Sequence, residues 1–324
     1  MKHFVKKFAQ TALAVPLAVA MTFTAAQAEP IKIALAETPS DELAAFFVAL
    51  ERAKANGLEY EWTAFSDEEL AIQAILSGQM DIGFGTPYSA MQRSRAPLRI
   101  IFQLSKLKFF PVAVEEYTEL NQLDGQPIML HSRGGGTDSI ANVIESRLDM
   151  KFGERSYVPG SSNRVVAMLA GQAQATILDL SNKNKIIAEA GDRFNVLPMF
   201  DVDASDEALF ANLDWIQENS EQVNILVAAL ASVWQDMAED PTIISRETNP
   251  DGPIGQLPGE ILATLDDFYT EAVEGGLYDP NGGGRTAAMA DLEWYSASGQ
   301  LDGDPAEMNI EDFWYLAPLD AVAK

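Results

Sequence analysis

The sequence predicts an α/β fold of two lobes, each a mostly parallel sheet flanked by helices, with a ligand cleft between the lobes. The first observation is a repeated phrase, because Leu-(Ser/Ala)-Gly-Gln occurs at 76–79 and again at 169–172. Each copy ends an apolar helical pattern and precedes a short apolar run, which indicates a helix, a left-handed glycine and a buried strand. The copies start at Leu76 and Leu169, 93 residues apart. This spacing suits two similar lobes better than a solenoid, whose repeats are shorter.

The second observation is the alternation of strand and helix patterns along the chain. Apolar strand patterns are separated by amphipathic helical patterns, which is typical of a mainly parallel sheet with helices on both faces. The predicted strands are 31–35, 60–65, 80–84, 98–104, 127–131, 156–158 and 173–178. No long flexible linker interrupts the series, so we expect short crossovers between the lobes.

The predicted domain limits follow from these patterns. The first lobe takes residues 29–109 and 200–324, and the second takes 110–199. Residues 109–117 read as an extended segment that Pro111 makes an edge strand or a crossover. Residues 194–199 read as the return crossover, and the remainder from Asp201 onward reads as mostly helical. Hinges are expected near 110–112 and 197–200.

The N-terminal 28 residues predict a secretory signal peptide. Three lysines precede an apolar stretch, and Ala26-Gln27-Ala28 matches a small-x-small cleavage site. An uncleaved anchor is the less favoured alternative, because polar residues and Pro16 interrupt the stretch. The chain has no cysteine, which excludes cysteine-linked lipid and disulfides. We therefore expect a soluble periplasmic protein.

The charge of the chain is strongly negative. The formal net charge is −26, and removal of a leader with three lysines and no acid lowers it by three to −29. Such a charge argues against binding to nucleic acid or to anionic membrane surfaces, because both are polyanions. It leaves the charge of a small ligand open.

Candidate binding residues follow the predicted strands, because ligands of open α/β sheets bind beyond the carboxyl ends of the strands. The candidates in the first lobe are Thr38, Pro39, Thr86, Pro87, Tyr88, Ser105 and Lys106. Those in the second lobe are Gly135, Gly136, Thr137, Asp138, Ser139, Gly160, Ser161 and Asp179.

Each candidate also has a plain structural interpretation. The glycines at 134–136 expose backbone N–H groups at a helix start, which favours an anion, but they also suit a simple tight turn. Asp138 and Asp179 either complement helix N-termini or meet an amine on the ligand. Lys106 is most simply a solvated charge. Tyr88 either stacks on a planar ligand or belongs to the core.

Signals for an enzyme are weak. Past the leader the chain contains one histidine, His131, and a single His after an apolar strand is more often structural than catalytic. There is no G-x-S-x-G, no H-E-x-x-H, no P-loop and no dinucleotide fingerprint. No carboxylate spacing suggests metal ligands. We therefore expect neither cofactor nor metal.

Four segments together resemble the type II solute-binding proteins of ABC importers, and within them the sulfonate, taurine, nitrate and thiamine-pyrimidine-precursor binders. The segments are 76–87, its echo 169–179, the Leu-Asp-Gly-Gln-Pro-Ile run at 123–128, and 135–139. The resemblance covers about residues 30–200. It departs from the family in the first helix, in the loop Glu37–Leu43 and at Asp179, where many members carry Trp-Glu-Pro.

The resemblance implies a monomeric periplasmic protein that captures a small organic solute for the membrane permease of an ABC importer. Hydroxyls and helix N-termini favour a sulfonate or carboxylate, whereas Asp138 and Asp179 favour an amine or N-heterocycle; an amino-sulfonate satisfies both. Two alternatives stay open: a periplasmic sensor that presents its ligand to a receptor, and an enzyme resembling pyrimidine-precursor synthases, which would need His131 in the cleft.

Overall fold

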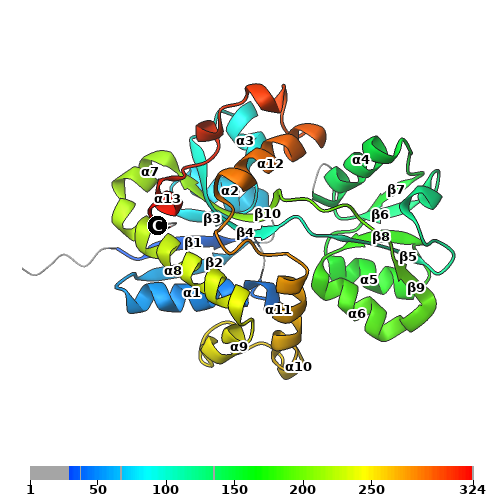
Figure 1. Cartoon of the computed structure of the whole chain (residues 1–324), viewed down its shortest axis with the longest axis horizontal. Helices are drawn as coiled ribbons and strands as arrows, with labels where there is room; N and C mark the ends of the chain where they lie inside the picture. Colours follow the sequence, from blue (N-terminus) through cyan, green and yellow to red (C-terminus); the bar gives the residue numbers. More distant parts are fainter. Residues whose placement is uncertain (1–28, 37, 66–67, 134–135, 323–324) are drawn as a thin grey trace, which may run out of the picture.

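Two five-stranded sheets organise the molecule, one in each of two lobes (Figure 1). The computed structural model describes residues 29–36, 38–65, 68–133 and 136–322. The prediction of a two-lobed α/β fold is confirmed. The predicted signal peptide at residues 1–28 lies outside the described residues, and the exact domain limits at 109/110 and 199/200 stay predictions.

The sheet of lobe 1 has the strand order β2-β1-β3-β10-β4. Its strands are β1 (Ile31–Leu35), β2 (Tyr60–Ala64), β3 (Ile82–Phe84), β4 (Leu98–Lys106) and β10 (Ser205–Asn212). β1 is parallel to β2 and β3, whereas β10 is antiparallel to β3 and β4. The four other strands therefore run the same way, and their carboxyl ends share one edge.

The sheet of lobe 2 repeats this plan in the order β7-β6-β8-β5-β9. Its strands are β5 (Phe110–Val114), β6 (Ile128–Leu130), β7 (Arg155–Tyr157), β8 (Ala175–Leu178) and β9 (Phe194–Val196). Here β5 is the antiparallel strand, between β8 and β9. Both sheets are therefore mixed, with a single reversed strand next to last in the order.

Helices cover both faces of each sheet. In Figure 1, α1 and α8 lie below the sheet of lobe 1 and α2, α3 and α12 above it, while α4 lies above the sheet of lobe 2 and α5 and α6 below it. The helices of lobe 1 are α1 (Ala44–Ala55), α2 (Glu68–Leu76), α3 (Tyr88–Arg93), α7 (Leu213–Glu218), α8 (Ser220–Glu239), α9 (Ile243–Glu247), α10 (Gly259–Leu262), α11 (Leu265–Glu274), α12 (Gly284–Ala297) and α13 (Ala317–Val322). Those of lobe 2 are α4 (Gly136–Leu148), α5 (Ser161–Leu169) and α6 (Leu180–Ala190). None of the helices within the described ranges combines the length and the apolar character that a bilayer crossing requires.

The repeated Leu-x-Gly-Gln phrase forms the same helix end in both lobes. Gly78 closes α2 with φ +72° and Gly171 closes α5 with φ +71°. In each copy the glycine N–H bonds to the carbonyl three residues back, and the following glutamine N–H to the carbonyl five residues back. This is the Schellman arrangement, in which a left-handed glycine satisfies the last helical carbonyls. β3 and β8 follow within a few residues, as predicted.

Three elements differ from the sequence prediction. Residues 194–196, expected within the return crossover, form strand β9, which pairs with β5. β5 is an interior strand, so the edge-strand interpretation of Pro111 is wrong; the proline sits near the strand start, where its carbonyl still accepts the Leu197 N–H at 2.8 Å. The segment from Ser205 to Asn212, expected within a mostly helical region, is strand β10. Its Ser-Asp-Glu start is polar, and only Ala208 to Ala211 form an apolar run, so its place inside a sheet depends on partners distant in sequence.

Candidate functional site

The carboxyl edges of the two sheets face each other across the lobe interface. Asp41 lies in the 3-10 turn Asp41–Leu43 that follows β1, and its Oδ2 accepts a hydrogen bond from the Ser181 hydroxyl at 2.8 Å. Ser181 lies in the first turn of α6, directly after β8. Burial, and after it the nearby charge of Asp179, raises the pKa of Asp41. We call the groups that lie beyond the carboxyl ends of the strands in the two lobes, together with Glu68 beside Thr86, the interlobe site: Asp41, Glu68, Thr86, Ser161, Asp179 and Ser181.

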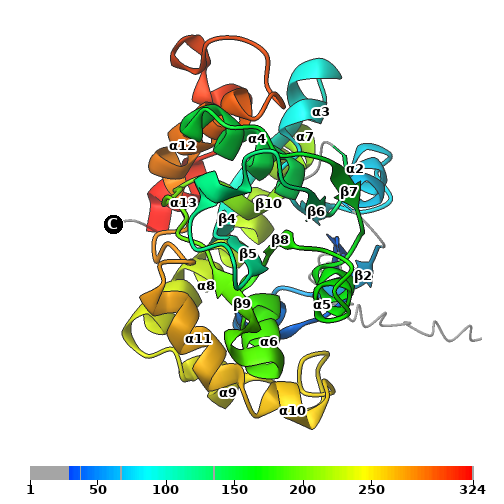
Figure 2. The same cartoon turned by 90° about the vertical axis from the view of Figure 1, so that its right-hand side faces the viewer.

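Further contacts join the lobes beside this junction. On α6, Lys183 forms an ion pair with Glu271 of α11, and the Asn184 side chain donates to the same carboxylate at 2.6 Å. These two helices lie side by side in both views (Figure 2). At the start of α4, the Ser139 hydroxyl accepts from the Gln300 amide at 2.8 Å. The interface is therefore held by polar contacts that a relative movement of the lobes would break.

In lobe 1, the carboxylate of Glu68 lies at the carboxyl end of β3. Glu68, in the first turn of α2, accepts the Thr86 backbone N–H at 2.6 Å through Oε1. Gly85 makes room for it, because a Cβ built on that residue would lie 2.2 Å from the same oxygen. Gly85 also has φ +125°, a conformation that side chains disfavour. Burial raises the pKa of Glu68.

The predicted residues of lobe 1 separate into two groups. Thr38 is exposed, and Pro39 and Thr86 are half-buried, all beyond strand ends. Tyr88, by contrast, is fully buried, and its hydroxyl donates to Asp291 at 2.5 Å. Tyr88 is therefore a core residue, which was one of its two interpretations. Pro87 is buried as the N-cap of α3.

Ser105 and Lys106 end β4 at the same sheet edge. The Ser105 hydroxyl accepts the Glu207 N–H at 3.3 Å, and the Lys106 ammonium pairs with Asp203 at 2.8 Å. Both side chains thus contact groups within residues 203–207, and Lys106 is a partly exposed charge in an ion pair near the surface.

The glycine-rich segment gives the start of α4. Gly135 lies outside the described residues, and Gly136 is exposed as the first residue of α4. The Thr137 hydroxyl accepts the His131 N–H at 2.8 Å, which ties the helix start to the end of β6. Asp138 is buried and accepts from Arg155 at 2.7 Å and from the Tyr157 hydroxyl at 3.1 Å. Its carboxylate is thus paired inside lobe 2.

A buried arginine organises the start of α5. Arg164 is 1% exposed, and its guanidinium donates to the carbonyls of Val158 and Ile177 and to the Ser161 hydroxyl. Burial lowers its pKa to about 10. Gly160, the N-cap with φ 82°, donates its N–H to Nδ1 of His131 at 3.2 Å. Ser161 therefore sits at the sheet edge with its hydroxyl oriented by the arginine.

Asp179 caps the third helix of lobe 2. Its Oδ1 accepts the Asn182 N–H at 2.8 Å, so the interpretation as a helix-capping carboxylate is correct. It also lies near Asp41 of lobe 1, which leaves its second interpretation, a contact with the ligand, as a prediction.

Sequence reasoning missed Asp41, Glu68 and Ser181 as members of the site. Two of them are carboxylates in first helical turns, a position that the helix dipole alone explains. The packing of α2 over Gly85 places Glu68 at the end of β3, and the contact of α6 with lobe 1 brings Ser181 to Asp41. One sequence feature could have pointed to Glu68. Gly85, the glycine after β3, has no side chain and leaves a space that the Glu68 side chain fills.

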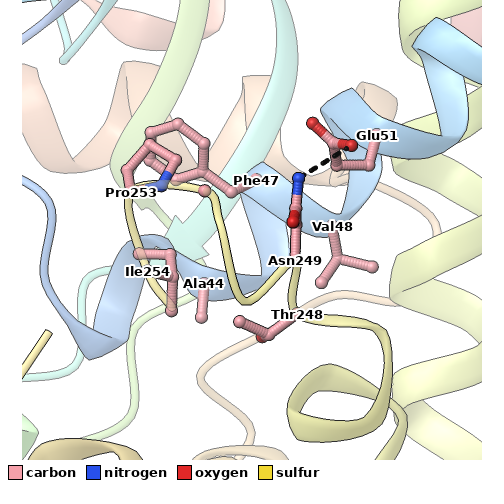
Figure 3. Close-up of a pocket in the computed structure, with 9 residues that line it drawn as sticks. Ala44, Phe47, Val48, Glu51, Thr248, Asn249, Pro253 and Ile254 are labelled. Atoms are coloured by element: carbon pink, nitrogen blue, oxygen red, sulfur yellow. Dashed lines mark hydrogen bonds between the residues drawn. The ribbon is translucent and has the colours of Figure 1, made fainter. Parts of the chain in front are cut away.

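Two hollows lie elsewhere on the molecule, and neither is lined by a residue of the interlobe site. One lies between α1 and the loop 248–254 and has room for about one water molecule, 10 Å³ (Figure 3). Asn249 there donates to Glu51 at 3.4 Å. The other, about 680 Å³, is an open groove between the end of α4 and residues 297–299. Among the described residues no group of His, Asp or Glu side chains is arranged to hold a metal ion.

Solved structures share the fold at low sequence identity. The periplasmic sulfonate-binding protein SsuA of Methylobacillus flagellatus matches with TM-score 0.62 and 16% identity over 91% of this chain and 94% of that one. The periplasmic nitrate-binding protein NrtA of Synechocystis matches with TM-score 0.66 and 12% identity over 91% and 88%. The ligand-binding component of an ABC-type import system from Staphylococcus aureus matches with TM-score 0.67 and 10% identity over 91% and 99%.

At the sequence level the comparisons give one family. No curated protein sequence matches the chain. The sequence profile described as NMT1/THI5 like matches residues 41–243, more than half of the chain. The matched part includes the whole lobe 2 sheet and all six residues of the interlobe site. The resemblance drawn from the repeated phrase is thereby confirmed, and the chain belongs to the NMT1/THI5-like family.

Proposed function

We propose that the protein is a periplasmic solute-binding protein that holds a small organic molecule between its lobes and delivers it to the permease of an ABC importer. The single observation that supports this most is the contact between the two carboxyl sheet edges, where the Ser181 hydroxyl bonds to Asp41. Ligands of such sheets bind at these edges. The periplasmic binding proteins among the structural neighbours favour the same function.

The proposed ligand contacts come from both lobes. They are Thr38 and Thr86 with the carboxylates Asp41 and Glu68 in lobe 1, and Gly136, Ser161, Asp179 and Ser181 in lobe 2. Tyr88 and Asp138 are left out, because both side chains are buried, Tyr88 against Asp291 and Asp138 in an ion pair with Arg155. The candidate solutes are a sulfonate, an amino-sulfonate or an N-heterocycle.

Ligand binding would close the lobes about the two chain crossovers. Residues 110–112 belong to β5 and 197–204 lie between β9 and β10. A strand inside a sheet resists bending, so we place the first hinge at 107–109 and the second at 197–204. Closure would bring Ser181 to Asp41 and Lys183 to Glu271, the contacts present in this structure.

The function is tested by purifying the full chain from the periplasm of its own host and identifying any bound solute by mass spectrometry. Thermal-shift measurements against a metabolite panel follow after ligand removal by partial unfolding. A solute that stabilises the protein in proportion to its concentration supports the proposal. Absence of a co-purified solute together with no stabilisation by any panel member contradicts it.

A sensor role keeps the same site and differs only in its partner. A permease and an ATPase encoded beside this gene, with loss of solute uptake on its deletion, would favour the importer. Retained uptake with loss of a transcriptional or motility response would favour the sensor.

An enzyme is the second candidate, and the position of His131 is the observation that bears on it. His131 follows β6 at the sheet edge, and its Nδ1 accepts the Gly160 N–H. That bond gives the imidazole a role in holding the start of α5, so we infer binding without catalysis. The His131→Ala variant is expected to bind solute with little change; loss of a measurable turnover on substitution would instead support the enzyme.

A further inference from the structure

The start of helix α1 receives a hydrogen-bond partner from a distant part of the chain. The residue before α1 is Leu43, whose side chain cannot accept a hydrogen bond, and Ala45 in the first turn is only 1% exposed to water. The Tyr269 hydroxyl of α11 accepts the Ala45 N–H at 2.8 Å. Because a first-turn N–H has no partner within its own helix, Tyr269 supplies the acceptor that the local sequence lacks.

The same hydroxyl holds the loop after β1. It donates to the Asp41 carbonyl at 2.8 Å, with the Glu42 carbonyl at 3.3 Å. Tyr269 is fully buried, and its ring stacks on Tyr278 with 5.8 Å between the ring centres. The phenol therefore donates and accepts at once, and a phenylalanine ring would fill the same space without either bond.

Asp41, which Tyr269 holds through the backbone carbonyl, contacts lobe 2 through its side chain. Its Oδ2 accepts the Ser181 hydroxyl at 2.8 Å, and two residues further along α6 Lys183 pairs with Glu271 of α11. Helix α6 thus meets lobe 1 at two points, one on the loop after β1 and one on α11. Since both donors belong to one helix, the two contacts form together only when Asp41 and Glu271 keep a matching separation.

Helix α11 is itself tied to the hinge region. The carbonyl of Gly275, its C-cap, accepts from the Lys108 ammonium in the first crossover, and Lys108 also pairs with Asp201 in the second crossover at 3.5 Å. In Figure 1 and Figure 2, α11 lies beside α6. Helix α11 therefore provides a fixed reference for the position of lobe 2, and Tyr269 joins the loop after β1 to that reference.

We propose that Tyr269 is a positioning residue of the interlobe site: its hydroxyl sets Asp41 relative to Glu271, so that α6 meets both and the lobes close. This rests on the function proposed above, in which the lobes close on a solute. Tyr269 is buried and acts through Asp41, not by contact with the solute. It therefore governs how readily the site closes and leaves the charge of the solute open.

The test measures the arrangement of the lobes in the full chain by double electron–electron resonance between two spin labels. The chain has no cysteine, so Val166→Cys on α5 and Met289→Cys on α12, at positions 62% and 52% exposed, place one label in each lobe. Adding Tyr269→Phe to this labelled parent should raise the population outside the parent's main distance at least threefold. A factor of about this size or more corresponds to the net contribution of one hydrogen bond.

Tyr60→Phe is the matched control. It also removes a phenol hydroxyl bonded within lobe 1, in this case to Glu51 of α1 at 2.7 Å, and it should leave the distances unchanged. A merely structural Tyr269 hydroxyl would lower the melting temperature of Tyr269→Phe and leave its distances as in the parent. That result, or an equal shift in Tyr60→Phe, overturns the inference.

A double variant tests the route through Asp41. Ser181→Ala removes the lobe 2 partner of Asp41 and should shift the distances in the same direction as Tyr269→Phe. Because the two hydroxyls act through the same carboxylate, the combined variant should shift them no further than Ser181→Ala alone. Additive shifts would show that Tyr269 acts elsewhere and would overturn the assignment.

A second measurement decides if Tyr269→Phe does not give a native circular dichroism spectrum. Coupling between two contacts works in both directions, so loss of the Ser181 contact should loosen the bond between Tyr269 and Ala45. Hydrogen exchange at the Ala45 amide should therefore be at least threefold faster in Ser181→Ala, and unchanged in Ser162→Ala, which alters an exposed serine of the same lobe. An unchanged rate in Ser181→Ala overturns the inference.

The two proposals fail separately. Lobe distances that do not respond to Tyr269→Phe overturn the positioning role and leave solute binding intact. A protein that carries no solute and responds to no metabolite overturns the function itself, whereas a distance shift in Tyr269→Phe would still hold.

Discussion

A single buried carboxylate ties the loop after β3 to the C-terminal part of the chain. Asp291 of α12 is fully buried and accepts from the Tyr88 hydroxyl at 2.5 Å and from the Ser205 N–H at 2.5 Å. Trp314 donates to the same tyrosine hydroxyl at 2.9 Å. These hydrogen bonds join Tyr88 at the start of α3 to α12, to β10 and to the segment around Trp314. Because Tyr88 lies two residues after Thr86, the network holds the loop after β3 in place.

Asp291 predicts a specific dependence of stability on pH. Burial raises its pKa from 3.8 to about 6. Between these values the folded protein keeps a proton that the unfolded chain has lost, so the free energy of unfolding falls as pH rises from about 4 to about 6. The loss from this group is about 3 kcal/mol, complete above its folded-state pKa.

The measurement is urea unfolding of the wild type and Asp291→Asn at several pH values between 4 and 7.5. Taking the difference removes the contributions of the other carboxylates. The variant should gain stability relative to the wild type as pH rises through the window. Parallel curves for the two proteins would show that Asp291 does not titrate there.

At the level of elements, the two helix ends formed by the repeated phrase, at Gly78 and Gly171, can be compared by the same substitution. Gly78 and Gly171 have nearly the same φ, and a Cβ at either would meet nothing within 4 Å. Alanine at each position therefore costs only the left-handed backbone conformation, about 1 kcal/mol.

Gly78→Ala and Gly171→Ala should lower the free energy of unfolding by similar amounts in chemical denaturation. Gly85→Ala is the contrasting variant, because its Cβ would collide with the Glu68 carboxylate; it should cost more and should also disturb ligand binding. A Gly85→Ala variant no less stable than the other two would contradict the close contact.

Local patterns were enough to predict most elements, because apolar periodicity and helix ends are encoded within short segments. β1 and the glycine ends of α2 and α5 follow directly from such patterns. β10 was missed because it becomes a strand only between β3 and β4, the nearer of which ends at Lys106, 99 residues before β10 begins at Ser205. Glu68 was missed for a similar reason, since its place in the site depends on how α2 packs over Gly85. Tyr88 was left between two interpretations because burial of an aromatic residue after a strand is decided by tertiary packing.

For the whole molecule, the contacts between α6 and α11 predict a balance between closed and more open shapes. Glu271 receives both Lys183 and Asn184 from the opposite lobe. Partly exposed ion pairs contribute little to stability, typically below about 1 kcal/mol. Their loss should therefore change the relative position of the lobes more than the free energy of unfolding.

The Glu271→Ala variant should show a larger radius of gyration in solution scattering without ligand, while its melting temperature stays close to the wild type. Glu274→Ala removes the same charge from an exposed position on α11 and is the control. Unchanged scattering in the first variant, or equal expansion in both, would argue against this contact as a closing element.

The position of β10 has a consequence for the order in which the chain acquires its structure. Lobe 2 has a sheet drawn from one continuous stretch, from Phe110 to Val196, whereas the lobe 1 sheet keeps a gap between β3 and β4 until residues 205–212 arrive. In a chain synthesised from its N-terminus, β1, β2, β3 and β4 are therefore complete before β10, which pairs with β3 and β4, is available. The second lobe, synthesised in between, has all its strands before the first lobe does, and the long separation of β4 from its partner makes completion of lobe 1 the slow, late step of folding.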